Sequence, residues 1–288
     1  MIDILVLNFN DADTTIQFVE SVYDFKCVNK ILVVDNCSTD NSYEKICSCT
    51  DDKVVVIRSE KNGGYGAGNN FGIRYLKEKY NSEFILLCNP DVVIDEQTCV
   101  ELEIFLRNNR DYAIAAPFML DSSRKKTFNT AFRIPRVTEY VFSLEMVFSK
   151  FLKPFYYRKN ELENAKYKDV GAVSGSLFMM NVSHMLLHGM YDERIFLYCE
   201  EIVLGLKLKN AGLKTALLPK LSFIHNHSVS ISKSFKSQLS RHRLFMSSKL
   251  FVIKEYFNAN TFVYVVAYIL SKLSLLEVRI ISLIRGIK

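Results

Sequence analysis

An apolar strand that ends at a proline is the feature that most constrains the fold of this chain. Phe84 to Cys88 are five consecutive apolar residues without polar alternation, so they predict a strand buried on both faces. Asn89 and Pro90 end the strand, because proline has no N–H to donate to a neighbouring strand. Asp91 is therefore expected at the carboxyl end of a central strand, the edge of an open α/β sheet where ligands bind.

The chemistry of Asp91 allows two interpretations. A carboxylate at that edge can hold a divalent cation, which prefers oxygen ligands and can itself bind phosphates. An Asn-Pro-Asp sequence is also typical of a turn whose aspartate caps the next segment. Both interpretations stay open when Asp91 is considered alone.

Strands alternate with helices over the first 120 residues, a pattern that predicts an α/β fold with a mostly parallel, Rossmann-like sheet and helices on both faces. A further helix is expected from Glu201 to Asn210, with Gly212 as its C-cap. The other expected strands are Ile2–Leu7, Lys30–Val34, Lys53–Ile57 and Ala113–Pro117, and the expected helices include Thr14–Tyr23, Ser42–Ile46 and Gln97–Leu106.

The glycine-rich stretch Asn62–Gly72 is expected to form a loop before a helix that runs to Leu76. It does not match a dinucleotide-binding fingerprint, because its last glycine comes one residue late and after the third strand, and it lacks the Gly-Lys-Ser/Thr of a triphosphate-binding loop. Its small residues and the amides of Asn69 and Asn70 suit a ligand that approaches the backbone closely. A tight connection without a ligand explains the glycines equally well.

Charge is unevenly distributed along the chain. Residues 231–288 hold ten Lys or Arg against two Glu, a net charge of +8, whereas the first 230 residues carry −2. A cationic end of this kind is typical of proteins that bind a membrane surface or nucleic acid. The seven cysteines lack the spacing of zinc ligands, and no basic leader with an apolar segment begins the chain, so we expect reduced cysteines in a cytoplasmic protein.

The cationic tail, residues 231–288, contains two apolar runs, Thr261–Leu270 and Leu273–Ile284, separated around Lys272. A membrane-spanning helix needs about 20 apolar residues, and charged residues including Glu277 interrupt this stretch. We therefore expect a helix that lies peripherally in the inner face of the cell membrane, with its cations toward anionic lipid. A helical pair that packs on the domain or forms a homodimer is the open alternative.

Four motifs, in this order and at this spacing, resemble the family 2 glycosyltransferases of the GT-A fold, and in particular their rhamnosyltransferase-like branch. The motifs are Val6–Asn10, Val33–Asp40, Asn62–Gly72 and Asn89–Asp91. The likeness continues through Val173–Ser176, Gly189–Glu201 and His225, and it covers about residues 2–230. It implies a GT-A domain over residues 1–230, with a variable acceptor-side excursion at residues 120–168 and a separate C-terminal helical tail.

The resemblance implies a site for a nucleotide-diphosphate sugar. Asp91, at the last position of the Asp-x-Asp motif of the family, would bind Mg²⁺ or Mn²⁺, and His225 matches a late histidine that completes this metal site in some members. A histidine in a polar loop is the alternative for His225. Asp35 is suited to accept the imide N–H of uracil or thymine. The residues implied to contact the donor are Asn8, Phe9, Asp35, Asn36, Asn62, Gly66, Asn70, Asn89 and Asp91.

The resemblance also implies an inverting reaction in which a carboxylate takes the proton of the acceptor hydroxyl. The family has Glu-Asp, a hydrophobic residue and a second Asp, whereas this chain has Glu200-Glu201-Ile202-Val203. Glu201 takes the place of the base with one methylene more, a shift larger than the roughly 1 Å misplacement that can cost about a hundredfold in rate. Glu200 is the second candidate, and two acids at a helix start also complement the helix dipole.

The function expected from this resemblance is metal-dependent transfer of rhamnose from dTDP-rhamnose to a cell-surface polysaccharide or a lipid-linked glycan. One alternative is a transferase that uses a UDP-sugar, galactose or galactofuranose. Another is a degenerate member that binds nucleotide with little turnover, because Glu201 and Val203 depart from the family pattern. No nucleic-acid partner is expected, since no nucleic-acid-binding motif accompanies the cationic tail.

Overall fold

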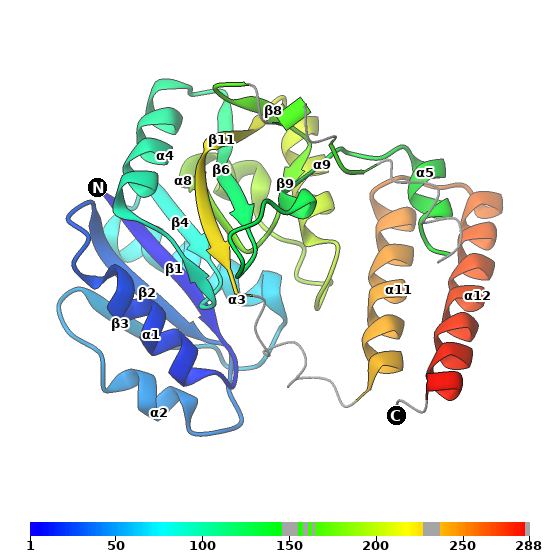
Figure 1. The fold of residues 1–288 in the computed structure, drawn as a ribbon, viewed down its shortest axis with the longest axis horizontal. Helices are drawn as coiled ribbons and strands as arrows, with labels where there is room; N and C mark the ends of the chain where they lie inside the picture. Colours follow the sequence, from blue (N-terminus) through cyan, green and yellow to red (C-terminus); the bar gives the residue numbers. More distant parts are fainter. Residues whose placement is uncertain (146–154, 158–160, 163–164, 227–236, 286–288) are drawn as a thin grey trace.

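The computed structural model describes residues 1–145, 155–157, 161–162, 165–226 and 237–285 (Figure 1). Its strands are β1 Ile2–Asn8, β2 Val28–Asp35, β3 Val54–Arg58, β4 Phe84–Cys88, β5 Val92–Val93, β6 Tyr112–Leu120, β7 Ala131–Phe132, β8 Lys168–Val170, β9 Ala172–Val173, β10 Leu177–Asn181 and β11 Lys214–His225. Its helices are α1 Ala12–Tyr23, α2 Ser42–Cys47, α3 Tyr65–Tyr80, α4 Glu96–Asn108, α5 Val137–Phe142, α8 Val182–His184, α9 Glu200–Asn210, α11 Gln238–Glu255 and α12 Thr261–Arg285, with shorter turns at Phe128–Thr130 and Met185–Gly189.

The central sheet has the order β3-β2-β1-β4-β10-β6-β11-β5, and β8 pairs with β11. The pairs β3–β2, β2–β1, β1–β4 and β6–β11 are parallel, whereas β10 runs antiparallel between β4 and β6. The fold class is thus confirmed as α/β with a mostly parallel sheet. The expected strands and helices of the first 120 residues appear within a few residues of their predicted ends, apart from the start of α3.

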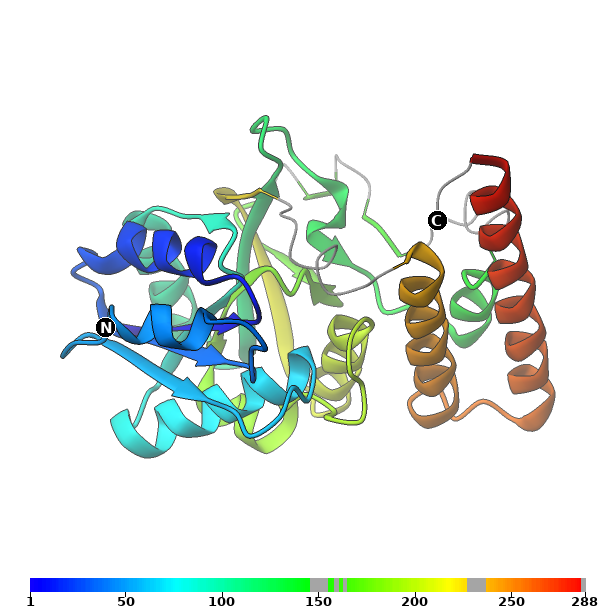
Figure 2. The same ribbon diagram turned by 90° about the horizontal axis from the view of Figure 1, so that it is seen from below.

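Two apolar cores lie on opposite faces of this sheet, because successive strand side chains point in opposite directions. Ile4 and Val6 of β1 belong to the core that α1 and α4 cover, whereas Leu5 belongs to the core that α3 and α9 cover. Figures 1 and 2 show the helices on the two faces. All residues of β4 are buried, as a strand between two such layers requires.

The glycine-rich stretch is helix rather than loop from Tyr65 onward, so this part of the sequence prediction is wrong. A Cβ at Gly68 would lie 2.5 Å from Cδ1 of Leu7, and one at Gly72 would lie 2.3 Å from Cδ1 of Leu5. These glycines let α3 approach the sheet closely. Within the stretch, positive φ is confined to Gly64, at +91°, directly before the helix.

The tail helices α11 and α12 lie side by side at one end of the molecule, next to α5 (Figures 1 and 2). Their inner faces share an apolar cluster with α5 and with the segment Ile195–Val203, so the tail packs on the domain. Helix α5 lies in the expected acceptor-side excursion at residues 120–168, of which residues 146–154, 158–160 and 163–164 lie outside the described part. By length and composition, one described helix is suited to cross a membrane, residues Thr261–Ile284, with a mean hydropathy of 1.6. All seven cysteines are free, as expected.

Candidate functional site

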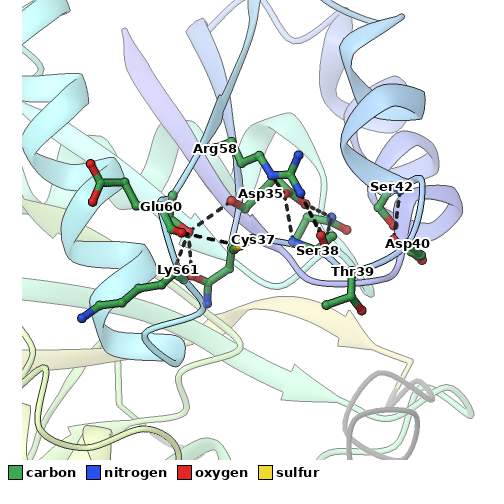
Figure 3. A network of polar contacts seen from close by, with 12 residues as sticks. Asp35, Cys37, Ser38, Thr39, Asp40, Ser42, Arg58, Glu60 and Lys61 are labelled. Carbon is green, nitrogen blue, oxygen red and sulfur yellow. Dashed lines mark hydrogen bonds and ion pairs between the residues drawn. The ribbon is translucent and has the colours of Figure 1, made fainter.

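Asp35 is a fully buried carboxylate at the carboxyl end of β2, where the parallel strands β1, β2 and β3 end together. Its Oδ1 accepts a hydrogen bond from Nδ2 of Asn8 at 2.9 Å, and its Oδ2 accepts one from the backbone N–H of Ser38 at 3.0 Å. Nε of Arg58 lies 3.4 Å from Oδ2 (Figure 3). The sequence analysis missed Arg58, although its place as the last residue of β3 puts it at this edge. Phe9, which follows β1, is partly exposed there.

Asn36 and Asn62 together hold the chain that enters α3. Nδ2 of Asn36 donates to Oδ1 of Asn62 at 3.1 Å and to the carbonyl of Gly64 at 3.1 Å. Oδ1 of Asn62 also accepts the backbone N–H of Gly64 at 3.0 Å. Both asparagines therefore shape this edge of the sheet, and their contact with a nucleotide stays a prediction.

Asn70 and Gly66, both on α3, contact the segment that leads to the acid pair. The Asn70 amide donates to the carbonyl of Tyr191 at 3.0 Å and accepts the Tyr191 N–H at 2.9 Å. A Cβ at Gly66 would lie 2.8 Å from Cβ of Tyr191, so glycine makes room for that ring. The structure thus assigns both residues a positioning contact, and contact with the diphosphate stays a prediction.

Asp91 and His225 lie together at the sheet edge, although 134 positions separate them in the sequence. His225 is the last residue of β11 and pairs with Val92 of β5, so the polar-loop alternative for this histidine is wrong. Its Nε2 lies 3.2 Å from Oδ1 of Asp91, and the two side chains are 12% and 10% exposed. Backbone N–H of Asn226 donates to the Asp91 carbonyl at 2.9 Å, which fixes this junction.

The donor atoms of Asp91 and His225 fit a divalent cation that is shared with a ligand. A carboxylate oxygen and an imidazole nitrogen supply two ligands, and Mg²⁺ or Mn²⁺ usually takes its remaining ligands from phosphate and water. Among the residues that the structure describes, no group of three or more His, Cys, Asp or Glu side chains is arranged to hold a metal. The pair thus suits a cation that binds together with a diphosphate.

The acid pair Glu200 and Glu201 begins α9, directly after two strained residues. Tyr198 and Cys199 have φ of +74° and +71°, a left-handed backbone that residues other than glycine seldom adopt and that often marks functional sites. Burial, and then the charge of Glu201, raises the pKa of Glu200 to about 8. Burial also raises the pKa of Glu201. With a pKa of about 8, Glu200 holds a proton at neutral pH, so a negative charge on the pair would lie on its neighbour.

Glu201 is the better placed of the two acids to carry that charge. Its Oε1 lies 3.4 Å from the backbone N–H of Gly175, a contact that favours the ionised form. Oε1 of Glu200 is buried and has no hydrogen-bond partner in the described part of the chain. The pair lines a small cavity of about 10 Å³, and Tyr65 and Tyr191 are among its other lining residues.

Tyr65 and Tyr191 are site residues that the sequence analysis missed. The Tyr65 hydroxyl donates to the Gly175 carbonyl at 2.6 Å, and the two tyrosine rings meet edge to face with centroids 5.7 Å apart. The signal available in the sequence was a large aromatic residue within a run of glycines at position 65, and a tyrosine directly before Asp192 in the other segment. Tyr65 thus holds the Gly175 carbonyl, and Tyr191 packs against the Tyr65 ring.

Gly175 and Ser176 join the two parts of the site. The Ser176 carbonyl accepts the backbone N–H of Asn89 at 2.8 Å, and the preceding N–H of Gly175 faces Glu201. The motif that ends at Asp91 and the acid pair on α9 therefore flank the same short turn between β9 and β10. The sequence analysis named both parts as site residues, and this turn is the structural link between them; their shared function stays a prediction.

Val203 stands where the family has its second acid, and the structure supplies a physical reason. Its side chain is 1% exposed and belongs to the apolar cluster that α9 shares with Met246, Val252 and Ile253 of α11. A carboxylate here would be buried among apolar side chains of α9 and α11, which is costly. The tail helices and the apolar residue at position 203 are therefore linked features of this chain.

Comparison with known proteins identifies the family of this chain. The family model for glycosyl transferase family 2 matches residues 3–184. The rhamnosyltransferase WbbL of Escherichia coli is 26% identical over 168 residues, which are 56% of this chain and 60% of WbbL. The low-salt glycan biosynthesis hexosyltransferase Agl10 of Haloferax volcanii is 27% identical over 256 residues, 87% of this chain and 76% of Agl10. The N-acetylglucosaminyl-diphospho-decaprenol L-rhamnosyltransferase of Mycobacterium tuberculosis is 25% identical over 228 residues, 74% of this chain and 71% of that protein.

Solved structures show the same fold at low sequence identity. GalNAc-T7 with UDP, GalNAc and Mn²⁺ superposes with a TM-score of 0.64 at 15% identity, over 89% of this chain and 49% of that chain. The mannosyltransferase PcManGT from Pyrobaculum calidifontis, in complex with GDP-Man and Mn²⁺, gives a TM-score of 0.55 at 11% identity, over 93% of this chain and 73% of that chain. The match of the family model over more than half of the sequence shows that this chain belongs to glycosyl transferase family 2, and its mostly parallel sheet agrees with the fold of these structures.

Proposed function

We propose that the protein transfers a sugar, with inversion, from a nucleotide-diphosphate donor to a glycan acceptor. The observation that carries this proposal is the turn Gly175–Ser176, which has the Asn89–Asp91 motif on one side and Glu201 on the other. Such an arrangement separates a site for the departing diphosphate from a base for the incoming hydroxyl. Rhamnose from dTDP-rhamnose is the first candidate, because two of the relatives are rhamnosyltransferases. A UDP-sugar, galactose or galactofuranose, is the second, since GalNAc-T7 was solved with UDP.

On the donor side, we assign the nucleoside to the strand ends that carry Asn8, Phe9, Asp35 and Asn36. Asp35 is held rigidly by its partners and is suited to accept an imide N–H. Asp91 and His225 would hold Mn²⁺ or Mg²⁺, which when bound supplies neutralising charge to the departing diphosphate. Mn²⁺ accompanies the nucleotide in both GalNAc-T7 and PcManGT, which supports this assignment.

On the acceptor side, Glu201 takes the proton of the acceptor hydroxyl as that oxygen attacks the sugar. The proton moves to a carboxylate oxygen of Glu201. The backbone N–H of Gly175 donates to Oε1 of the same carboxylate and holds it in place. Glu200, with a pKa of about 8, is protonated at neutral pH and so leaves the negative charge to its neighbour. A positioned general base contributes about 10²- to 10⁴-fold to the rate.

We further propose that α12 places the enzyme at the cytoplasmic face of a membrane, next to a lipid-linked or cell-surface glycan. Phe262, Ile269 and Leu283 on its outer face are 76%, 53% and 76% exposed. Apolar side chains exposed along one helix, within a tail of net positive charge, suit an anionic bilayer surface. A homodimer that covers the same face is the alternative.

Nucleotide release from a panel of donors tests the proposal. The full chain is incubated with dTDP-rhamnose, UDP-galactose or UDP-galactofuranose and a prenyl-diphosphate-linked N-acetylglucosamine acceptor, with Mn²⁺ or with EDTA. We expect release from one donor, abolished by EDTA and by Asp91→Asn but not by Asp24→Asn, which changes an exposed aspartate. No release from any donor would overturn the transferase, and tight nucleotide binding in that case would support the degenerate alternative.

A further inference from the structure

A second cavity lies at the junction of the tail with the domain. Tyr198, two residues before the acid pair, contributes to its wall. The cavity has a volume of about 380 Å³, and its described lining consists of Tyr198, Gln238, Arg241, His242, Phe245 and Val278. The size is that of a small-molecule site. Helix α11 contributes most of the lining, α12 contributes Val278, and Tyr198 belongs to the strained segment before Glu200.

Arg241 gives this cavity its chemical character. Its Nε is buried and has no hydrogen-bond partner in the described part of the chain. Buried polar groups usually have a partner, so an unsatisfied guanidinium nitrogen at a cavity wall indicates that a ligand supplies one. No Asp or Glu is among the described residues of the lining, which leaves the cavity positive. Phosphate matches the planar, multiple donors of a guanidinium well.

The rest of the lining is held firmly around Arg241. Nε2 of His242 lies 2.9 Å from Oγ of Ser274, a contact that joins α11 to α12. The rings of Tyr198 and Phe245 meet edge to face with centroids 5.4 Å apart. The cavity is therefore a built feature of the folded tail, and its aromatic wall suits the apolar or sugar group next to a phosphate.

We propose that this cavity binds the phosphate group of a lipid-linked acceptor, with Arg241 as its main contact. The proposal rests on the transferase function and names the acceptor class for the same site. Tyr198 links the cavity to the base, because it lies three positions from Glu201 along the chain. The helix that supplies Val278 also presents exposed Leu276 and Ile280, which suit the hydrocarbon of a lipid.

Binding of farnesyl diphosphate to the full chain, measured by calorimetry in EDTA without a donor, tests the proposal. EDTA removes metal-assisted diphosphate binding at Asp91 and His225. We expect Arg241→Gln to weaken the affinity at least tenfold, Arg241→Lys to weaken it less, and Arg243→Gln, an exposed change on the same helix, to leave it unchanged. Melting temperatures of all variants identify a fold defect, and the lysine variant then carries the test.

Two further ligands separate the sources of the phosphate. Farnesol without phosphate should bind at least tenfold more weakly than the diphosphate. Vesicles of phosphatidylglycerol should bind wild-type protein and Arg241→Gln alike, because a bilayer headgroup contacts the outer face of α12 instead. Equal binding of farnesyl diphosphate by wild type and Arg241→Gln, equal binding of farnesol, or vesicle binding that depends on Arg241 would each overturn the assignment.

This experiment is independent of turnover. Loss of farnesyl diphosphate selectivity leaves the transferase proposal standing, since the nucleotide-release assay tests that proposal separately. Conversely, selective binding without nucleotide release would support an anion site and overturn the transferase.

Discussion

The backbone N–H of Gly175 lies 3.4 Å from Oε1 of Glu201. The next residue of the turn, Ser176, accepts the N–H of Asn89 through its carbonyl at 2.8 Å. These two contacts connect the end of a central strand to the start of α9, although Asn89 precedes the turn by more than 80 positions and Glu201 follows it by 26. In the proposed reaction, a hydroxyl at Glu201 would meet a donor whose diphosphate is held on the other side of this turn, at Asp91.

The raised pKa of Glu200 predicts a pH-dependent stability. Burial raises the pKa of Glu200 in the folded protein to about 8, from the usual 4.5. Between these two pH values, Glu200 therefore retains a proton in the folded state that it has lost in the unfolded state. The free energy of unfolding then falls as the pH rises, by up to about 1.4 kcal/mol per pH unit. Glutamine at position 200 does not titrate. Between pH 5 and pH 8, the free energy of unfolding of Glu200→Gln, measured by urea denaturation, should therefore decrease less than that of wild type.

Glu20→Gln, a change of an exposed glutamate on α1, is the control and should follow the wild-type profile. Parallel profiles for wild type and Glu200→Gln would contradict the shifted pKa.

Val203→Asp tests whether the tail cluster explains the missing second acid. The new carboxylate would replace a side chain that is 1% exposed, among apolar residues of α9 and α11. We expect a loss of about 3 kcal/mol or more in the free energy of unfolding by urea. Asn210→Asp, at the exposed end of the same helix, should change it by less than about 1 kcal/mol. An equal effect of the two changes would show that position 203 tolerates an acid.

The central strand and its ligand edge could be predicted from the sequence, because an unbroken apolar run that ends at Asn89-Pro90 has few structural alternatives. The course of Asn62–Gly72 could not. Gly68 and Gly72 are glycines because Leu5 and Leu7 of another strand face them, and that proximity exists only in the folded chain. The same glycines would suit a loop, so local sequence favoured the wrong structure.

The candidate site also contains residues that the sequence predicts and residues that only the folded structure reveals. Asp91 and Glu201 were found from motifs that occupy strand and helix ends, whereas Tyr65 and Gly175 act through a hydrogen bond between residues 110 positions apart. In the sequence, Val203 is only a departure from the family pattern. In the structure, α11 packs against it, which gives a reason for an apolar residue there. Long-range packing of this kind leaves no local periodicity or spacing in the sequence.

Alanine substitutions at two glycines with positive φ distinguish the cost of a steric clash from the cost of the backbone conformation. Gly64 has φ +91°, and a Cβ there would lie 2.0 Å from the Phe196 carbonyl oxygen, whereas Gly212 has φ +72° and no atom within 4 Å of such a Cβ. Gly212→Ala should cost about 1 kcal/mol, the conformational contribution alone. Gly64→Ala should cost at least twice as much and displace the segment before the acid pair. Similar melting temperatures for the two variants would contradict the close contact between residues 64 and 196.

The outer face of α12 predicts vesicle binding. Ile269 and Leu276 are each 53% exposed, and replacing both with serine removes apolar surface without opening the core. We expect the double variant to bind phosphatidylglycerol vesicles roughly tenfold more weakly in sedimentation. Ile104→Ser, at a 47% exposed position on α4, should bind like wild type. Unchanged vesicle binding, with a wild-type dimer that the double variant dissociates in ultracentrifugation, would favour the homodimer instead.

The central claim is that Glu201 is the base, opposite a diphosphate held at Asp91. The most direct test compares the turnover of Glu201→Gln with that of Glu200→Gln. Both variants are assayed for nucleotide release at neutral pH with Mn²⁺, and their donor affinities are measured in parallel. The account predicts that Glu201→Gln loses at least about a hundredfold in kcat with unchanged donor affinity, while Glu200→Gln stays within tenfold of wild type. Wild-type turnover by Glu201→Gln would contradict it.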